Sequence, residues 1–372
     1  MLQVLFLVLL SLTGCFADWN FKKYDEDNEP LLLTPYIEQG RIKEGREAAR
    51  VPPLLGSIHS YSGFFTVDKE YHSNLFFWYF PAEETSEKDD SAPVILWLNG
   101  GPGVTSMYGL LLENGPISLG KDNTLAKRAI HWSKHCHMIY IDNPVGVGFS
   151  FTDRNGLVNN ETQISTEMHN ALVQFFQIFP YLSKNSFFVA GESYAGRYVP
   201  AIAYEIHRSN PTSKVNINLK GVMIGSFSGI SKLFNDTLIR KHLHVGQVKF
   251  TVSNMEINNE IWQGDGLMNV SSFVEVLLEH YRVMYYNGQL DLTLPYYNCE
   301  TYAERLQWSG APEYHNAARN QWIVGGELAG FFRSGGNLTL VLVRNSGHMV
   351  PLDQPEWAFD LVTKFVNDQH MV

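Results

Sequence analysis

Short apolar runs recur along the chain and alternate with longer stretches that have helical spacing. Most of these runs are continuous and rich in β-branched or aromatic residues, which is the pattern of strands buried on both faces of a parallel sheet. They predict central strands at 94–98, 138–141, 187–190, 222–225, 282–286 and 338–344. Two further runs, 61–66 and 74–80, have the pattern of an antiparallel pair placed before these strands. This order predicts the α/β class, with a mostly parallel central sheet and helices on both of its faces.

The stretches 161–179 and 194–209 are predicted to be helices that connect neighbouring strands. Pro200 lies inside the second stretch, and an interior proline removes one helical hydrogen bond and crowds the preceding turn. We therefore expect Pro200 to kink this helix or to end its first segment. Because the chain has no internal repeat and no low-complexity linker, we expect one domain over residues 18–372.

The first 17 residues, MLQVLFLVLLSLTGCFA, are apolar and end in small residues. A membrane span needs about 20 apolar residues, so this stretch fits the core of a signal peptide better. We expect residues 1–17 to be a signal peptide, with an uncleaved membrane anchor as the alternative. No other apolar run reaches this length, so no membrane contact is expected after cleavage. The expected destination is the secretory route, either secretion or a lysosome or vacuole.

Four Asn-X-Ser/Thr sequons fit a glycoprotein of the secretory route, and they lie at Asn160, Asn235, Asn269 and Asn337. After cleavage only Cys136 and Cys299 remain, so the chain can form one disulfide at most, and whether they pair stays open. The apolar core, and not a disulfide framework, must therefore stabilise the fold.

Acidic residues outnumber basic ones, with 38 Asp+Glu against 28 Lys+Arg and a formal net charge of −10. Because phosphate binding needs a basic surface, nucleic acid is excluded as a partner. The 45% of hydrophobic residues and 13% of aromatic residues exclude a disordered chain. The segment His135-Cys136-His137 has no further ligand at metal spacing, so neither a metal nor another cofactor is predicted. Oligomeric state stays open.

The sequence GESYAG at 191–196 directly follows a predicted strand and precedes a predicted helix. A strand, a turn and a helix with small residues around a serine form a strained turn that lifts the hydroxyl above the strand ends. Ser193 is therefore a candidate nucleophile. The short pattern alone also arises by chance, so its partners decide its meaning.

A serine hydroxyl needs a base, and in this fold class an acid and then a histidine follow the serine, each after a strand. Of the seven histidines after Ser193, only His348 comes just past a long strand-like run. Asp291 lies just beyond another predicted strand, where its carboxylate could orient the imidazole. The alternatives are that the preceding Asn287-Gly288 is only a turn and that His348 is a surface histidine.

The sequence WLNGGPG at 97–103 ends a further predicted strand. It lacks the Lys-Ser/Thr pair of a phosphate loop, and no basic residue follows before Lys121. It fits an oxyanion-hole loop, because glycines let main-chain N–H groups point into a cleft. One N–H of this loop and the N–H of Tyr194 would then face the developing alkoxide.

Six segments in this order resemble the serine carboxypeptidase family of α/β-hydrolases: WLNGGPG, ENGPISL, IDNPVGVGFSFTD, GESYAGRYVPAIA, YNGQLDL and NSGHMVPLDQP. The flanking TPYIEQGRI and QFFQIFP resemble most its vitellogenic carboxypeptidase-like branch. The resemblance implies an α/β-hydrolase fold and a protease that releases C-terminal amino acids from peptides at acidic pH. It implies Ser193 as the nucleophile, His348 as the base and Asp291 as the orienting acid.

The resemblance also implies how substrate is held. Its oxyanion donors would be the N–H groups of Gly101 and Tyr194. The family binds the free C-terminal carboxylate of the substrate with four residues, which match here Asn99, Gly100, Glu113 and Glu192. Three crowded carboxyl groups cannot all ionise, so at least one glutamate must keep a proton, and binding should weaken as the pH rises towards neutral. The plainer interpretations are a solvated helix-entry residue for Glu192 and a loop charge for Glu113.

Two departures from the family stand out. The glycine loop continues with Val104-Thr105-Ser106 where the family has Cys-Ser-Ser, which removes half of a disulfide and leaves Ser106 to hydrogen-bond the loop. The family also carries a long helical cap over the active site where only residues 226–241 stand here. We expect the cap to be reduced or absent, and water exclusion and substrate positioning to suffer. The alternatives are an esterase or acyltransferase, or a catalytically impaired binding or storage glycoprotein.

Overall fold

The computed structural model describes residues 29–370, except for 56, 84–90, 121, 123, 226–242, 247, 249 and 266–268. The predicted signal peptide at 1–17, the sequon at Asn235 and the predicted loss of the cap at 226–241 therefore lie outside the described residues.

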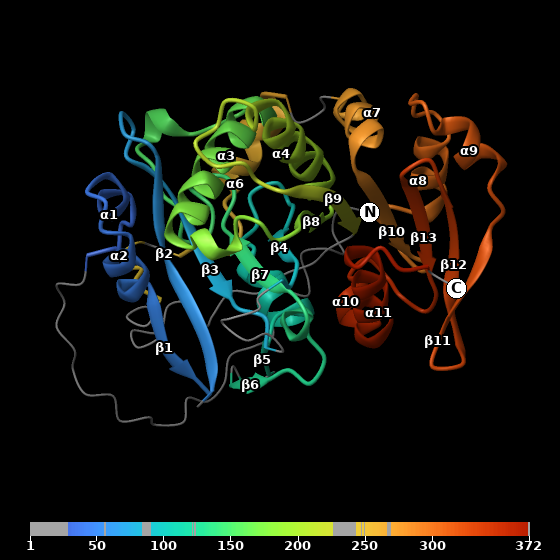
Figure 1. The fold of residues 1–372 in the computed structure, drawn as a ribbon, viewed down its shortest axis with the longest axis horizontal. Coiled ribbons are helices and arrows are strands. Elements are labelled where there is room, and N and C mark those ends of the chain that lie inside the picture. The colour runs from blue at the N-terminus through green and yellow to red at the C-terminus, as the bar shows by residue number, and fades with distance from the viewer. Residues whose placement is uncertain are drawn as a thin grey trace.

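One mixed sheet of 11 strands crosses the molecule in the order β1-β2-β3-β7-β4-β8-β9-β10-β13-β12-β11 (Figure 1). Its strands are β1 (Arg50–Leu54), β2 (Ile58–Asp68), β3 (Ser73–Phe80), β4 (Val94–Leu98), β7 (His137–Ile141), β8 (Phe187–Glu192), β9 (Leu219–Gly225), β10 (Arg282–Gly288), β11 (Asn320–Val324), β12 (Glu327–Gly335) and β13 (Leu338–Val343). The six strands from β7 to β13 in this order run parallel, and the strands beyond them pair antiparallel. A separate hairpin joins β5 (Ile117–Leu119) to β6 (Leu125–Lys127). The predicted class and all six predicted central strands are confirmed.

The central strands are buried on both faces, as their continuous apolar runs predict. In β4, Val94, Leu96 and Leu98 belong to one core cluster, whereas Ile95 and Trp97 belong to the other. Successive side chains of a strand point to opposite faces, so a strand covered on both sides must be apolar at every position.

Helices cover both faces of the sheet. The core cluster around Val94 includes residues of α3, α4 and α7, and the opposite cluster includes residues of α11. In Figure 1, α3 and α4 lie above the middle strands and α10 and α11 lie below them. The helices are α1 (Thr34–Glu38), α2 (Ile42–Ala48), α3 (Glu161–Ile178), α4 (Ala195–Ser209), α6 (Met255–Gln263), α7 (Ser271–His280), α8 (Tyr296–Ala303), α9 (Ala311–Asn316), α10 (Val350–Asp353) and α11 (Pro355–Val366). In the part of the chain that the structure describes, no helix combines the length and the apolar character that crossing a membrane requires.

The structure differs from the sequence-based prediction at Pro200. Helix α4 continues through this residue, so the expected end of a first helical segment is not found. Pro200 lies in the second turn of the helix, and because it lacks an N–H, the hydrogen bond to the Gly196 carbonyl is missing. Its side chain is buried. Packing of α4 against α3 and β9 offsets that loss.

The antiparallel strands β11 and β12 at the C-terminal edge were not predicted. Only Trp322 is buried among the five residues of β11, because this strand closes the edge of the sheet. An edge strand that buries so few residues has neither a continuous apolar run nor a clear alternation, so the sequence pattern does not reveal it.

Candidate active site

The three predicted catalytic residues lie at the same edge of the sheet. Ser193 follows β8, Asp291 follows β10, and His348 comes after β13. These strands are parallel and lie in the adjacent order β8-β9-β10-β13, so their carboxyl ends meet at one edge. Ligand sites of open α/β sheets form at this edge.

Ser193 occupies a strained turn. Its φ of 58° lies in the left-handed region, which is unfavourable for a residue with a side chain. The Ser193 N–H donates to the carbonyl of Gly225 at the end of β9, which ties the turn to the neighbouring strand. A Cβ at Gly191 would lie 2.5 Å from the Leu98 carbonyl and 2.7 Å from the Ala195 side chain. The glycine before the serine therefore allows the close strand-to-helix passage that the sequence predicts.

Asp291 orients the imidazole of His348. Its Oδ2 lies 2.8 Å from Nδ1 of His348, and the carboxylate is fully buried. Its Oδ1 accepts the main-chain N–H groups of Thr293 at 2.8 Å and Leu294 at 3.0 Å. These bonds fix the carboxylate, so Nε2 of the ring is left for proton transfer.

Within the described residues, no hydrogen bond links the Ser193 hydroxyl to His348. Burial lowers the pKa of His348, and Asp291 opposes this effect. A neutral imidazole is the form that can accept a proton.

The glycine loop after β4 contacts the turn that carries Ser193. A Cβ at Gly100 would overlap the main-chain nitrogen of Tyr194, and it would lie 2.8 Å from the Glu192 carbonyl and 2.9 Å from the Ala195 nitrogen. In the described part of the chain, the N–H groups of Gly101 and Tyr194 have no hydrogen-bond acceptor. The loop and the turn together can therefore present two donors to an oxyanion.

Asn99 joins two buried glutamates beside this loop. Its Nδ2 donates to Oε1 of Glu113 at 3.2 Å and to Oε1 of Glu192 at 3.4 Å. Its Oδ1 accepts from Trp97 Nε1 at 2.9 Å and from the Gly109 N–H at 3.0 Å, which fixes the orientation of the amide. The second oxygen of each glutamate has no partner in the described residues.

The two glutamates cannot both ionise here. Burial raises the pKa of Glu113 to about 7, and burial together with the Glu113 carboxyl raises the pKa of Glu192 well above its ordinary value. The plainer interpretations of Glu192 as a solvated residue and of Glu113 as a loop charge are wrong, because their exposures are 0% and 1%. A neutral acid has a proton to donate, so the pair can bind a carboxylate.

Sequence reasoning did not single out Asp142, which holds the loops around the site. This buried carboxylate follows β7 and accepts from the Ser106 N–H at 3.0 Å, the Thr105 hydroxyl at 2.5 Å and the Phe149 N–H at 2.8 Å. Ser106 makes the loop contact expected from the sequence, because its hydroxyl accepts the Asn99 N–H at 3.3 Å. The signals for Asp142 in the sequence were its position just after a predicted strand and its place in the segment IDNPVGVGFSFTD.

The remaining predicted positions are the sequons and the two cysteines, of which Cys299 lies near Asp291. Asn269 and Asn337 are exposed and Asn160 is partly exposed, so their side chains reach the surface. Cys136 and Cys299 are free, and the Cys299 thiol donates to Oδ1 of Asn287 at 2.9 Å.

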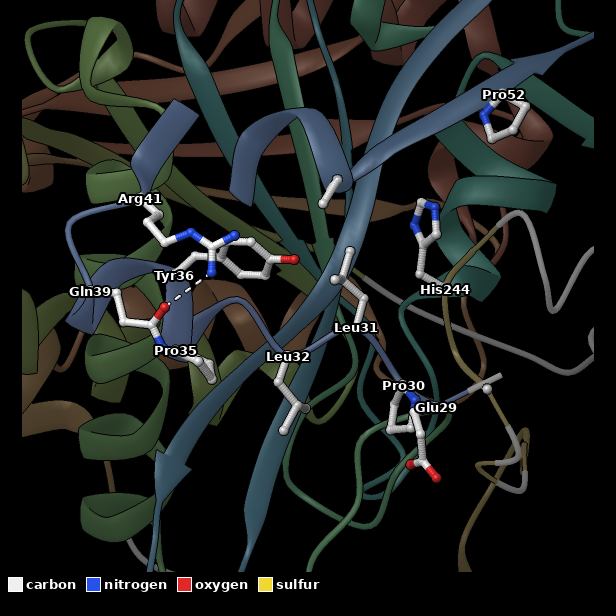
Figure 2. Close-up of a pocket in the computed structure, with 12 residues that line it drawn as sticks. Glu29, Pro30, Leu31, Leu32, Pro35, Tyr36, Gln39, Arg41, Pro52 and His244 are labelled. Carbon is white, nitrogen blue, oxygen red and sulfur yellow. Dashed lines mark hydrogen bonds between the residues drawn. The ribbon is translucent and has the colours of Figure 1, made fainter. Parts of the chain in front are cut away.

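Figure 2 shows a pocket at the N-terminal side of the described chain, lined by Leu31, Tyr36, Arg41 and His244 among others. It contains none of the predicted site residues, and Arg41 in it bonds to Gln39 at 3.1 Å. The chemistry described above therefore lies elsewhere.

Comparison with known proteins gives the same family as the motifs. The family model described as serine carboxypeptidase matches residues 53–230 and 226–368. The venom serine carboxypeptidase of Apis mellifera is 39% identical over 430 residues, which cover 91% of this chain and 91% of that protein. The vitellogenic carboxypeptidase of Aedes aegypti is 36% identical, and the match covers 93% of this chain and 92% of that protein.

Among solved structures, a prohormone-processing carboxypeptidase from Saccharomyces cerevisiae, Kex1, has a similar fold. The TM-score is 0.78 at 20% sequence identity, and the match covers 87% of this chain and 96% of that structure. At this identity the likeness concerns the fold.

Proposed function

The chain belongs to the serine carboxypeptidase family of hydrolases, and from this premise we propose that it releases C-terminal amino acids from peptides through an acyl-enzyme. Ser193 is the nucleophile, His348 the general base and Asp291 the acid that orients it. The contact of 2.8 Å between His348 Nδ1 and Asp291 Oδ2 supports these roles.

The reaction has two halves. His348 accepts the Ser193 proton while Oγ attacks the carbonyl of the last peptide bond, and His348 then gives this proton to the leaving amino acid. Water, activated by the same imidazole, attacks the acyl-enzyme and releases the shortened peptide. The N–H groups of Gly101 and Tyr194 stabilise the oxyanion in both halves. The hydrogen bond between Ser193 and His348 forms with substrate bound.

The single observation that favours an exopeptidase is the buried cluster of Asn99, Glu113 and Glu192. A simple esterase needs no such cluster, because its substrates carry no terminal carboxylate. In this proposal the Asn99 amide and the Gly100 main chain hold that carboxylate, and a proton shared by the two glutamates supplies a further hydrogen bond.

We propose that the family's helical cap is absent from this chain. The two parts of the family match meet at residues 226–230, and the alignment with the Apis mellifera protein runs over 430 positions although this chain has only 372 residues. A binding or storage glycoprotein without activity is the second candidate, since loss of the cap would admit water to the cleft.

Secretory targeting, with peptides as substrates, fits a family that includes a venom protein.

The test compares three substrates at about pH 5. We expect an N-blocked dipeptide acid to be cleaved with a kcat/KM at least ~10²-fold above that of its C-terminal amide, because the amide leaves the buried acid pair unsatisfied. Ser193→Ala serves as the control for contaminating activity. Turnover of a simple ester without cleavage of the dipeptide acid would contradict the proposal and favour an esterase. No turnover of any substrate would favour the silent glycoprotein.

The acid pair predicts a pH-dependent KM. Below about pH 7 Glu113 is protonated, and above it the carboxylate repels the carboxylate of the substrate. We expect KM for the dipeptide acid to rise roughly tenfold between about pH 5.5 and pH 8. KM for a cleavable ester without a free carboxylate should stay constant, which makes the ester the control. Glu113→Gln stays neutral at every pH, so this variant should lose most of the rise. A KM that stays flat for the acid substrate of the wild type would refute the shared proton.

A further inference from the structure

A second group of buried polar side chains lies behind Tyr194, outside the residues assigned above. Glu161 begins α3 with 0% exposure, Tyr198 belongs to α4 and is fully buried, and Asp265, which is partly buried, comes just after α6. Both carboxyl oxygens of Glu161, Oδ1 of Asp265 and the two tyrosine hydroxyls are buried without a hydrogen-bond partner of normal geometry in the described residues. Buried polar groups are nearly always satisfied, so this concentration calls for an explanation.

These groups face one another. Oδ2 of Asp265 accepts the Glu161 N–H at 2.8 Å, which holds the start of α3 against the segment after α6. The Tyr194 hydroxyl lies near enough to the Glu161 carboxyl for the two groups to interact. The Tyr194 ring is packed between the Tyr198 ring at 5.1 Å and the Trp262 ring at 5.4 Å.

The surroundings favour a neutral Glu161. The titratable and charged groups that face it are Asp265, Tyr194 at the N-cap of α4, and Tyr198 and Arg197 within α4. Burial and the neighbouring Asp265 raise the pKa of Glu161 to about 8, against the effects of Tyr194 and Arg197. A neutral carboxyl group both donates and accepts hydrogen bonds, so it can serve a tyrosine hydroxyl. An acid that only complements the helix dipole would stay in contact with water.

We propose that Glu161 is a positioning residue for the oxyanion hole. Its carboxyl group holds the Tyr194 hydroxyl, and this contact fixes the residue whose main-chain N–H faces the oxyanion. The inference rests on the proposed function in one respect, namely that the Tyr194 N–H is an oxyanion donor. Because the contact acts on the transition state and not on the terminal carboxylate, it affects kcat and leaves KM nearly unchanged.

The test uses four forms of the full chain: wild type, Glu161→Ala, Glu161→Gln and Glu167→Ala. Glu167 is the matched control, because it is a buried acid of the same helix whose charged and hydrogen-bonding neighbours are Gln163 and Asp68, and neither belongs to α4. At about pH 6 we expect Glu161→Ala to lower kcat at least ~10-fold with KM within about twofold, whereas Glu161→Gln and Glu167→Ala stay within about threefold of wild type.

The inference is overturned if Glu161→Ala keeps its kcat, if the glutamine variant loses as much as the alanine variant, or if Glu167→Ala loses as much. Each form is assayed on the blocked dipeptide acid and on a simple ester, which uses the same oxyanion hole without the carboxylate site. If wild type turns over only the ester, the carboxypeptidase proposal is refuted. The kcat values of the variants on the ester then still test the role of Glu161. Where wild type turns over neither substrate, the rate at which a serine-reactive phosphonate labels Ser193 replaces kcat. A wild type that is not labelled refutes both proposals.

Discussion

Asp291→Asn is expected to lower kcat by about 10³–10⁴-fold, or roughly 4–5.5 kcal/mol of transition-state stabilisation, with little change in KM. The reason is geometric. Oδ1 of Asp291 accepts the N–H groups of Thr293 and Leu294, so the carbonyl oxygen of an asparagine must occupy this position. The NH₂ group would then face Nδ1 of His348, which must become an acceptor. The ring proton would move to Nε2, and the imidazole could no longer accept the Ser193 proton.

The chain offers a matched control for this variant. Asp153 and His72 form a pair with the same distance of 2.8 Å between Oδ2 and Nδ1, but their side chains are 62% and 75% exposed. Asp153→Asn should therefore change kcat by less than about twofold, because an exposed pair contributes little. Single-turnover assays of both variants, with circular dichroism to verify folding, measure the difference. A folded Asp291→Asn variant with kcat within about tenfold of wild type would contradict the triad.

Part of the site was predictable because its signals are local. Ser193, Asp291 and His348 each follow an apolar run, and parallel strands bring their carboxyl ends to one edge. The chain order of these residues and the strand alternation were enough to place them there. The roles of Asn99, Glu113 and Glu192 in binding the substrate carboxylate came instead from the family resemblance, because nothing in the local sequence indicates that Glu113 is buried.

Other features depend on packing between distant segments and leave no local signal. Glu161 follows the N-cap Asn160 and reads as an ordinary acid at the start of a helix. It is buried by the residue after α6 and by α4, which lie far away in sequence. From the sequence, Pro200 is expected to break the helix. Helix α4 nevertheless continues, because packing of the helix's buried face stabilises it by more than the missing hydrogen bond costs. Tertiary contacts therefore decide the burial of Glu161 and the continuation of α4 through Pro200.

The contact between the glycine loop and the nucleophile turn leads to the second prediction. Gly100→Ala should lower kcat by about 10²–10³-fold, because the new Cβ would overlap the main-chain nitrogen of Tyr194. The nearest atoms all belong to the main chain of residues 192–195, so no side chain can rotate away to relieve the overlap. The loop and the turn must move apart, which separates the N–H groups of Gly101 and Tyr194 that form the proposed oxyanion hole. Overpacking of this kind also lowers the free energy of unfolding by about 1–3 kcal/mol.

Gly196→Ala separates this specific overlap from a general intolerance of the turn to larger residues. Gly196 lies in the first turn of α4, and a Cβ there meets only the Ile224 side chain, at an ordinary 3.5 Å. Alanine is the better helix former, so this variant should keep wild-type kcat and gain up to about 1 kcal/mol of stability. Ester hydrolysis and thermal unfolding of both variants measure the two effects. Equal losses in the two variants would mean that the turn rejects any added methyl group, and wild-type activity of Gly100→Ala would mean that the loop does not form the oxyanion hole.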